Sequence, residues 1–200
     1  MNTNNHLAYP FAYHRGKRIS FVRSEQTESS YFGGPGNNDV IESCQDGPYH
    51  IHHIASISNR DVGVLGYEFG FSIPFYYPMR ADGCELSYRR TATKAIQITS
   101  VAPPEPTGVE WPFPYEGYSP LLPYIPLKVH EAEDVAPEDF SEDVMQGIEG
   151  LEEDELIFVV PPNPTMGVSL WGPWLDGEDI QIIFRYRSSS GTMRVYSACT

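Results

Sequence analysis

Histidines, carboxylates and tryptophans are the side chains in this sequence that could do chemistry, and the histidines are the most closely spaced. His50, His52 and His53 lie in the stretch YHIHHIASIS, which alternates as a strand does. In a strand, His50 and His52 share one face and His53 points to the other. Two histidines could begin a zinc site, but such a site takes three or four ligands and no third lies nearby in the sequence. We predict no metal and no cofactor, and keep the His50/His52 face as the basis of an alternative function, a small metal-dependent hydrolase.

Other catalytic signatures are missing. The sequence has no GxSxG nucleophile elbow. The stretch FGGPG lacks the Lys-Ser/Thr of a phosphate-binding loop and is typical of a turn. Among the acids, Glu110 beside Trp111 comes nearest to a carboxyl in apolar surroundings. We therefore predict a protein that is not an enzyme.

The carboxylates concentrate in one segment, EAEDVAPEDFSEDVMQGIEGLEEDE at residues 131–155. It holds twelve of the 27 acidic residues and no lysine or arginine. Pro137 suits a first helical position, and Phe140, Val144 and Ile148 follow at a spacing of four, which predicts a helix with one apolar stripe. Such a stripe can dock on a sheet.

The opposite face of this predicted helix carries Glu138, Asp139, Glu142 and Asp143. Two pairs of like charges at i, i+4 each cost a helix roughly 0.2–0.5 kcal/mol. A face that is merely solvated would usually include lysine. We interpret the charge as a surface for a basic protein partner.

A second candidate surface is the stretch LWGPWLDGED, in which glycine and proline hold Trp171 and Trp174. Tryptophans are enriched in interface hot spots, so these two could anchor a partner beside the acidic segment. Packing in the core is the other role that the sequence allows.

Composition excludes several classes of protein. The net charge of −14 disfavours direct binding of nucleic acid. No apolar run reaches the roughly 20 residues of a membrane span, and the N-terminus has no signal-like stretch. Three cysteines without paired spacing favour a reducing compartment over a disulfide framework. We expect a cytoplasmic protein.

The fold class that we predict is α+β and β-rich, with two related four-strand halves and one acidic helix inserted in the second. Aromatic residues at 13%, eighteen prolines and seventeen glycines favour short strands and many turns. The hairpin at 87–101 aligns without a gap with that at 184–198, and Arg90 matches Arg187, which indicates a duplication. The predicted divisions are a basic segment with a short strand at 1–30, a first half at 31–102, a proline-rich connector at 103–108, and a second half at 109–200 with the insertion at 131–155; together they form one compact domain.

Several of these stretches resemble the YwqG-like family of bacterial proteins of unknown function. The resemblance is carried by FGGPGNN, YHIHHIASISNRDV, VEWPFPYEGYSPLLPYIPLKV and ELIFVVPPN, within residues 31–164. It implies a mixed, β-rich fold and no catalytic residues. Relatives of such domains resemble immunity proteins encoded beside bacterial toxins.

The function that we expect is that of an immunity or antitoxin protein, which neutralises a basic toxin or nuclease surface without catalysis. A phage-type inhibitor that mimics nucleic acid is a further alternative. The predicted partner-binding residues are Glu138, Asp139, Glu142, Asp143, Glu152, Glu153, Asp154, Trp171 and Trp174.

Overall fold

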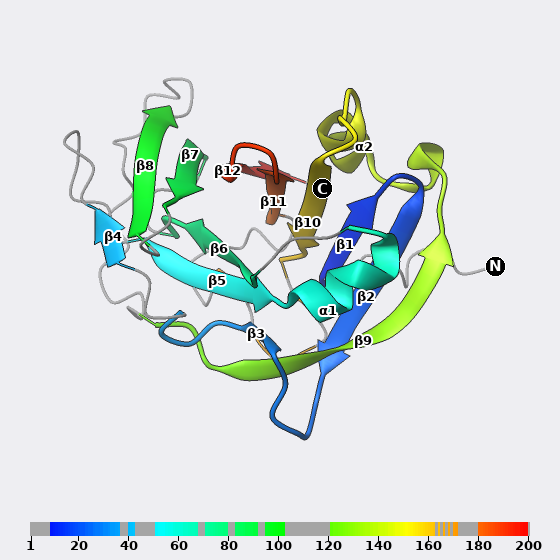
Figure 1. Cartoon of the computed structure of the whole chain (residues 1–200), viewed down its shortest axis with the longest axis horizontal. Helices are drawn as coiled ribbons and strands as arrows, with labels where there is room; N and C mark the ends of the chain where they lie inside the picture. Colours follow the sequence, from blue (N-terminus) through cyan, green and yellow to red (C-terminus); the bar gives the residue numbers. More distant parts are fainter. Residues whose placement is uncertain are drawn as a thin grey trace.

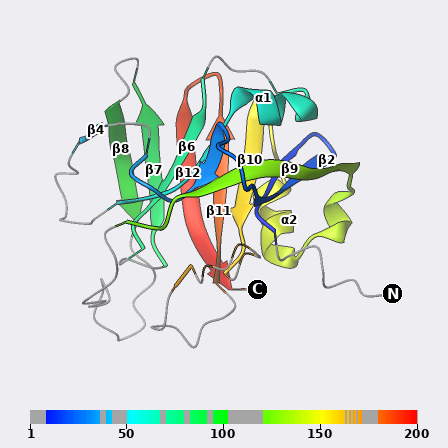
Figure 2. The same cartoon turned by 90° about the horizontal axis from the view of Figure 1, so that it is seen from below.

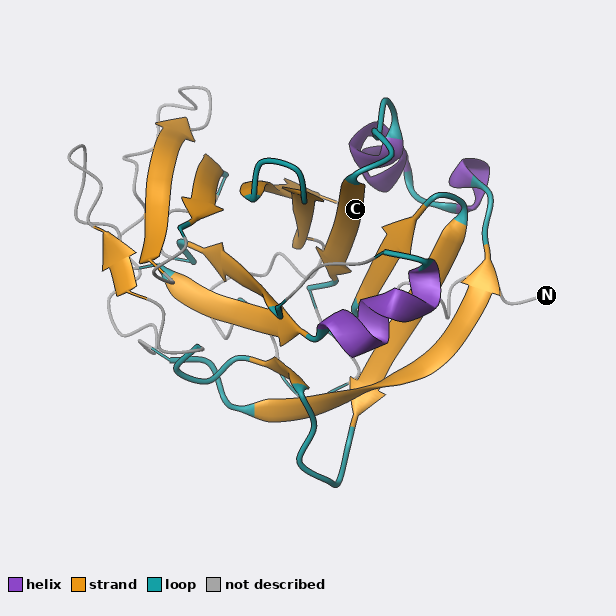
Figure 3. Ribbon diagram, viewed as in Figure 1, coloured by secondary structure: helices purple, strands orange, loops and turns teal. Residues whose placement is uncertain are grey.

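The computed structural model describes residues 9–36, 40–42, 51–67, 71–79, 83–91, 95–102, 121–162, 164, 166, 168, 170–171 and 180–199. Within these residues the protein is β-rich, as predicted, and short helical elements supplement one large sheet (Figure 3). No helix in the described part of the chain is long and apolar enough to cross a bilayer. His50, Glu110, Trp111, Trp174 and the connector at 103–108 lie outside the described residues.

Twelve described strands form a single sheet in the order β4-β8-β7-β12-β11-β10-β1-β2-β9-β3-β5-β6. Neighbours are antiparallel except β4 and β8, which are parallel. The strands are β1 (Phe11–His14), β2 (Lys17–Arg23), β3 (Ser30–Phe32), β4 (Val40–Glu42), β5 (His52–Ile57), β6 (Ile73–Tyr77), β7 (Glu85–Arg90), β8 (Ala95–Ala102), β9 (Ile125–Asp134), β10 (Glu155–Val160), β11 (Ile180–Arg187) and β12 (Thr192–Cys199).

The sheet curls on itself, and its inner face encloses the main core (Figure 1). Strands β6 and β10 are far apart in the strand order. Even so, the ring of Phe75 on β6 stacks on that of Phe158 on β10, with centroids 4.4 Å apart. Phe184 on β11 meets the same Phe75 ring edge-on at 5.0 Å. The aromatic residues that favoured a sheet in the sequence thus also fill its concave interior.

The outer face of the sheet is apolar around β1, β10 and β11 as well. All four residues of β1 and all six of β10 are buried. Alternate residues of a strand point to opposite faces, so these two strands must be covered on both sides. After β9 the chain forms the 3-10 helix η3 (Pro137–Asp139), which buries none of its residues, and the helix α2 (Glu142–Ile148) (Figure 2). On the outer side the cover is Val135, Phe140 and the buried face of α2.

The acidic segment therefore takes a different form from the single inserted helix that we predicted. Its first residues continue β9 and pair with β2, where Glu133 lies opposite Arg18. Its last residue, Glu155, begins β10. Between them, Phe140 has extended backbone (φ −98°, ψ 164°) and separates η3 from α2. The helical part is short because each end of the segment finds a strand to pair with.

The two hairpins that match in sequence lie side by side in the sheet. β7 pairs with β8, β11 pairs with β12, and β12 joins the two hairpins by pairing with β7. The other strands of the two predicted halves are arranged differently: β5 pairs with β6, whereas β1 and β2 separate β9 from β10.

The predicted turn at FGGPG is present directly after β3, where Gly33 and Gly34 have positive φ angles. A Cβ on Gly33 would lie 2.2 Å from the carbonyl oxygen of Pro123. The Gly33 N–H donates to the carbonyl of Ile54 at 2.8 Å. The glycine thus permits a close approach between the turn after β3 and the chain that enters β9.

We predict that Gly33→Ala lowers the free energy of unfolding far more than Gly16→Ala does. Gly16 also has a positive φ, +79°, but a Cβ there would meet nothing within 4 Å. Both changes should cost about 1–2 kcal/mol for the left-handed backbone, and Gly33→Ala about 1–3 kcal/mol more for the overlap. Urea denaturation of the two variants measures the difference; equal losses would contradict the close contact.

Candidate functional site

The acidic segment is held to the sheet by an apolar cluster that is separate from the main core. Phe140, Val144 and Ile148 are all buried, as the predicted stripe required. The ring of Phe140 stacks on Phe11 at 5.5 Å and meets Tyr13 edge-on at 5.3 Å. The stripe thus docks on the outer face of the sheet.

The break at Phe140 changes how the four acids of the predicted helical face are placed. Glu138 and Asp139 lie in η3, and Glu142 and Asp143 begin α2. They therefore do not form i, i+4 pairs in one helix, which removes the repulsion that a continuous helix would carry. Asp139 also accepts a hydrogen bond from the N–H of Ala136 at 3.2 Å.

Arg18 is the first of four arginines that the fold brings to the acidic segment. Its guanidinium is buried and bonds the Glu133 carboxylate at 2.6 Å. It also lies over the rings of Phe11 and Phe140, 5.7 and 5.5 Å from their centroids. One side chain thus joins β2, β9 and the turn before α2, through both its charge and its flat surface.

Glu155 is the centre of a second group of ion pairs. Its carboxylate accepts from Arg185 Nε at 2.9 Å, from Arg187 Nε at 3.1 Å and from the N–H of Glu152 at 3.0 Å. Arg185 also donates to the carbonyl of Gly150 at 2.7 Å, and Arg187 bonds Glu152 at 2.5 Å. These bonds fasten the turn after α2 to β11.

The pKa of Glu155 reflects this setting. Burial acts to raise the pKa of the carboxyl, but the hydrogen bonds from Arg185, the Glu152 N–H and Arg187 outweigh burial and hold it below its usual value. The carboxylate is therefore charged and paired at neutral pH. It has a structural role and is not poised as a catalytic acid.

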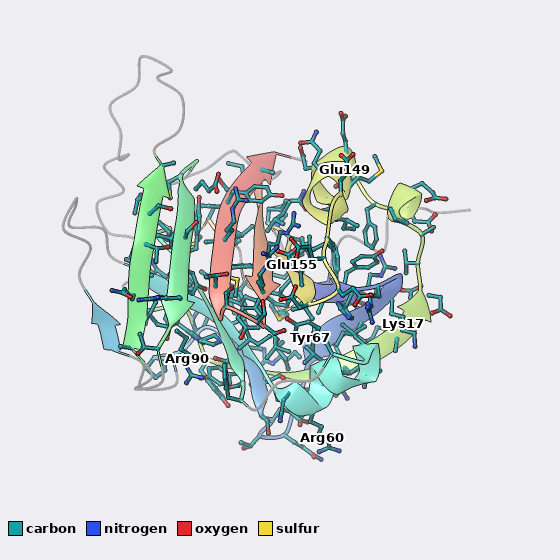
Figure 4. The ribbon with its side chains drawn as sticks, turned by 45° about the horizontal axis from the view of Figure 1, so that its top comes forward. Lys17, Arg60, Tyr67, Arg90, Glu149 and Glu155 are labelled. Carbon is teal, nitrogen blue, oxygen red and sulfur yellow. The ribbon has the colours of Figure 1, made fainter. Side chains whose placement is uncertain are left out.

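In the described part of the chain, the remaining acids of the segment have no arginine partner. Four acids of the segment pair with arginines: Glu133, Glu152, Glu153 and Glu155. Among the residues that the structure describes, the other eight make no ion pair; they are Glu131, Asp134, Glu138, Asp139, Glu142, Asp143, Glu149 and Asp154. Figure 4 shows the contrast, with Glu149 pointing away from the molecule and Glu155 set among the side chains of the sheet.

A groove of about 580 Å³ lies against α2, and we refer to it as the α2 groove. Acidic side chains from the first turn and from the end of the helix border it, and the exposed thioether of Met145 lies between them. The lining residues are Pro137, Glu142, Met145, Gln146, Ile148 and Glu149. An apolar floor with acidic borders suits a ligand that is apolar in its middle and basic at its edges.

The other predicted site residues lie elsewhere. Trp171 is buried in the main core, where its indole N–H donates to the carbonyl of Ile180 at 2.6 Å. This is the packing role that the sequence also allowed. Glu152 and Glu153 are engaged by arginines, and the side chain of Asp154 accepts from the N–H of Ser189 at 3.3 Å.

Of the histidines in this stretch, the structure describes two, and both lie in the interior. His52 and His53 are both buried. His53 hydrogen-bonds the carbonyl of Gly33 at 2.7 Å and the hydroxyl of Ser56 at 2.8 Å. Within the described ranges, no three histidine, cysteine or acidic side chains gather as a metal ion would require.

Sequence reasoning missed the arginines and Met145. A signal for the arginines exists: Arg185 and Arg187 are two residues apart on an apolar strand and so share one face. Two charges on a half-buried face require acidic neighbours. Which acids these are depends on strand pairing, which the sequence did not supply.

Comparisons of the chain with protein-family models, with curated proteins and with solved structures found no match.

We predict that Glu155→Gln destabilises the protein by about 1.5–3 kcal/mol at neutral pH, because two arginines lose a charged acceptor. The exposed pair of Glu153 and Arg15 provides the matched control, and Glu153→Gln should cost about 0–0.5 kcal/mol. Denaturation at pH 7 tests both.

The same variants have a pH signature. The pKa of Glu155 is lowered in the folded state, so its stabilisation is complete above the ordinary value of 4.5 and is lost as the pH falls through the folded pKa. The stability gap between the unmodified protein and Glu155→Gln should therefore shrink below about pH 4.5. A gap that stayed constant down to pH 3 would contradict the charged pairing.

Proposed function

We propose that this chain is a non-enzymatic binding protein that engages a basic protein surface at the α2 groove. The observation that carries the proposal is the division among the acids of the segment. Those that secure the fold are paired with arginine, whereas Glu138, Asp139, Glu142 and Glu149 are exposed and make no ion pair among the described residues.

The groove supports a specific mode of contact. Met145 is exposed between Glu142 and Glu149. Methionine is unbranched and adapts its shape to an apolar partner. The carboxylates would speed the encounter with a basic surface and make it sensitive to salt, while burial of Met145 would slow dissociation. In this proposal Met145 takes the anchoring role that the sequence also allowed for Trp171, which is buried.

The most concrete form of this function is an immunity or antitoxin protein. The partner would be a toxin whose basic surface, such as one that holds nucleic acid, is covered when it binds here. The acidic chain and the resemblance to the YwqG-like family support this form. In this proposal the protein acts by occupying a surface and carries no cofactor.

We also retain the internal duplication as a proposal. The adjacent positions of the β7–β8 and β11–β12 hairpins support it, since both occur in the same sheet and are joined edge to edge. The different pairing of the remaining strands would then be a later divergence, made when the N-terminal hairpin entered between β9 and β10.

We predict that Glu142→Lys and Glu149→Lys each weaken binding of a basic amphipathic peptide about three- to tenfold at low salt. A helical peptide of alternating leucine and lysine blocks serves as the probe, and calorimetry at 50 and 200 mM salt measures its affinity. Glu25→Lys is the matched control: it changes the net charge equally but lies on the turn between β2 and β3, away from α2 (Figure 1).

Met145→Ala should weaken the same binding with little change in its salt dependence, because it removes apolar contact and no charge. If Glu142→Lys, Glu149→Lys and the control Glu25→Lys weakened peptide binding equally, only the net charge would matter, and a localised site would be contradicted.

The immunity form predicts that the neighbouring gene encodes a toxin, and that co-expression of this chain restores growth. If the product of that gene failed to bind, the immunity form would fail, while the peptide experiment would still decide whether the α2 groove binds basic partners.

A further inference from the structure

Strand β9 has an outer edge that is only partly paired. On one side it pairs with β2 from Leu127 to Asp134, with one irregularity, a bulge at His130 opposite Ser20 and Phe21. On the other side β3 covers only Ile125 to Leu127. In the part of the chain that the structure describes, no strand pairs with this side of β9 beyond Leu127.

The hydrogen-bond pattern identifies which backbone groups face this edge. In a strand, the N–H and carbonyl of successive residues point alternately to the two neighbouring strands. Phe21 N–H donates to the Pro10 carbonyl, on the β1 side of β2. Ile19, two residues away, therefore also points its N–H and carbonyl toward β1. Ile19 lies opposite Ala132 in the pairing of β2 with β9. Ala132 therefore directs its N–H and carbonyl away from β2, and Asp134 does the same.

A second hydrogen bond, from Val135 N–H to the Gly16 carbonyl at 2.8 Å, agrees with this assignment. Val135 points its N–H toward the β1–β2 turn, so Asp134, the residue before it, points its N–H and carbonyl outward. The edge is also accessible, because Glu131, Ala132 and Asp134 are exposed. An exposed row of backbone donors and acceptors is a template for another strand.

The outer edge of β6, the last strand in the sheet order, is covered by a side chain, which the described part of the chain does not provide at β9. There, the hydroxyl of Tyr88 accepts from the N–H of Tyr76 at 2.8 Å and donates to the carbonyl of Pro74. Every residue of β6 is buried. Among the residues that the structure describes, a side chain thus covers the β6 edge and nothing covers the β9 edge beyond Leu127.

We propose that the outer edge of β9, from Val129 to Asp134, binds an extended basic segment of a partner protein as an additional strand. Charge selects this occupant. Glu131 and Glu133 lie on the face shared with α2, since they pair with Ser20 and Arg18. Arg18 already binds Glu133, so a basic side chain of the added strand would pair with Glu131 on this face. Asp134, which also makes no ion pair in the described part of the chain, would pair with another on the opposite face.

A second copy of this chain fits the edge poorly. In an antiparallel pair centred on Ala132, Glu131 of one copy would lie opposite Glu133 of the other, which Arg18 already binds, so Glu131 would gain no basic partner. This proposal and the proposed function both require a basic partner. They are otherwise independent, because binding at the β9 edge does not require the α2 groove.

The test uses the full chain and a ten-residue peptide in which lysine alternates with threonine or valine. Ala132→Pro removes the outward N–H without touching a bond to β2, and should weaken peptide binding at least tenfold by fluorescence anisotropy. Ala132→Val keeps the N–H and should bind as the unmodified protein does. A peptide of the same sequence with its four central amides N-methylated keeps the charge and should lose binding to the unmodified protein.

Peptide binding should also slow hydrogen exchange at the amides of Ala132 and Asp134. Equal affinity of the N-methylated peptide would overturn the proposal, as would absence of any peptide binding or of this protection. If Ala132→Pro does not fold, the N-methylated peptide decides alone. A dimer of the unmodified protein that Ala132→Pro abolishes would also overturn it, by making a second copy the occupant. Loss of binding in Ala132→Pro but not in Glu142→Lys separates this edge from the α2 groove.

Discussion

The apolar outer face of β1, β10 and β11 has to be kept from water, and the acidic segment does this. Phe140, Val144 and Ile148 supply the cover. Burial of three such side chains is worth roughly 5–9 kcal/mol as an upper estimate. Repulsion between neighbouring acids on a helix is worth only about 0.2–0.5 kcal/mol per pair. The apolar term therefore decides where this segment lies, in spite of its charge.

The same segment has to remain acidic at its surface and yet dock beside other acids. The structure separates these demands by position. At the margins of the docked part, Arg18 and the pair Arg185 and Arg187 neutralise Glu133 and Glu155, where burial would make unpaired charge costly. In the middle, where the chain faces solvent, the acids make no ion pair among the described residues, so their negative charge is not neutralised. A segment without a single basic residue is thus stabilised by basic residues from strands distant in sequence.

One stretch of chain, from β9 to α2, therefore forms the surface on which both proposals rest. Its first part presents backbone groups at a sheet edge, and its last part presents the α2 groove. Both arise because the chain leaves the sheet at Asp134 and returns to it at Glu155, crossing the outer face between. Rigid strands on either side fix the ends of this crossing, which favours a preorganised binding surface.

Much of the local structure followed from the sequence, and the partners of each element did not. Alternation predicted the hairpins β7–β8 and β11–β12, the turn glycines predicted the bend at Gly33, and a spacing of four predicted the buried stripe; each depends on neighbours in the chain. The break of the predicted helix at Phe140, the burial of Trp171 and the arginine partners of Glu155 were decided only in the tertiary structure. The reason is that pairing across a sheet joins residues more than 100 positions apart, such as Arg18 and Glu133. Periodicity in the chain carries no information about which strand will lie beside which, and it is that neighbour which determines whether an acid is neutralised or left to face a partner.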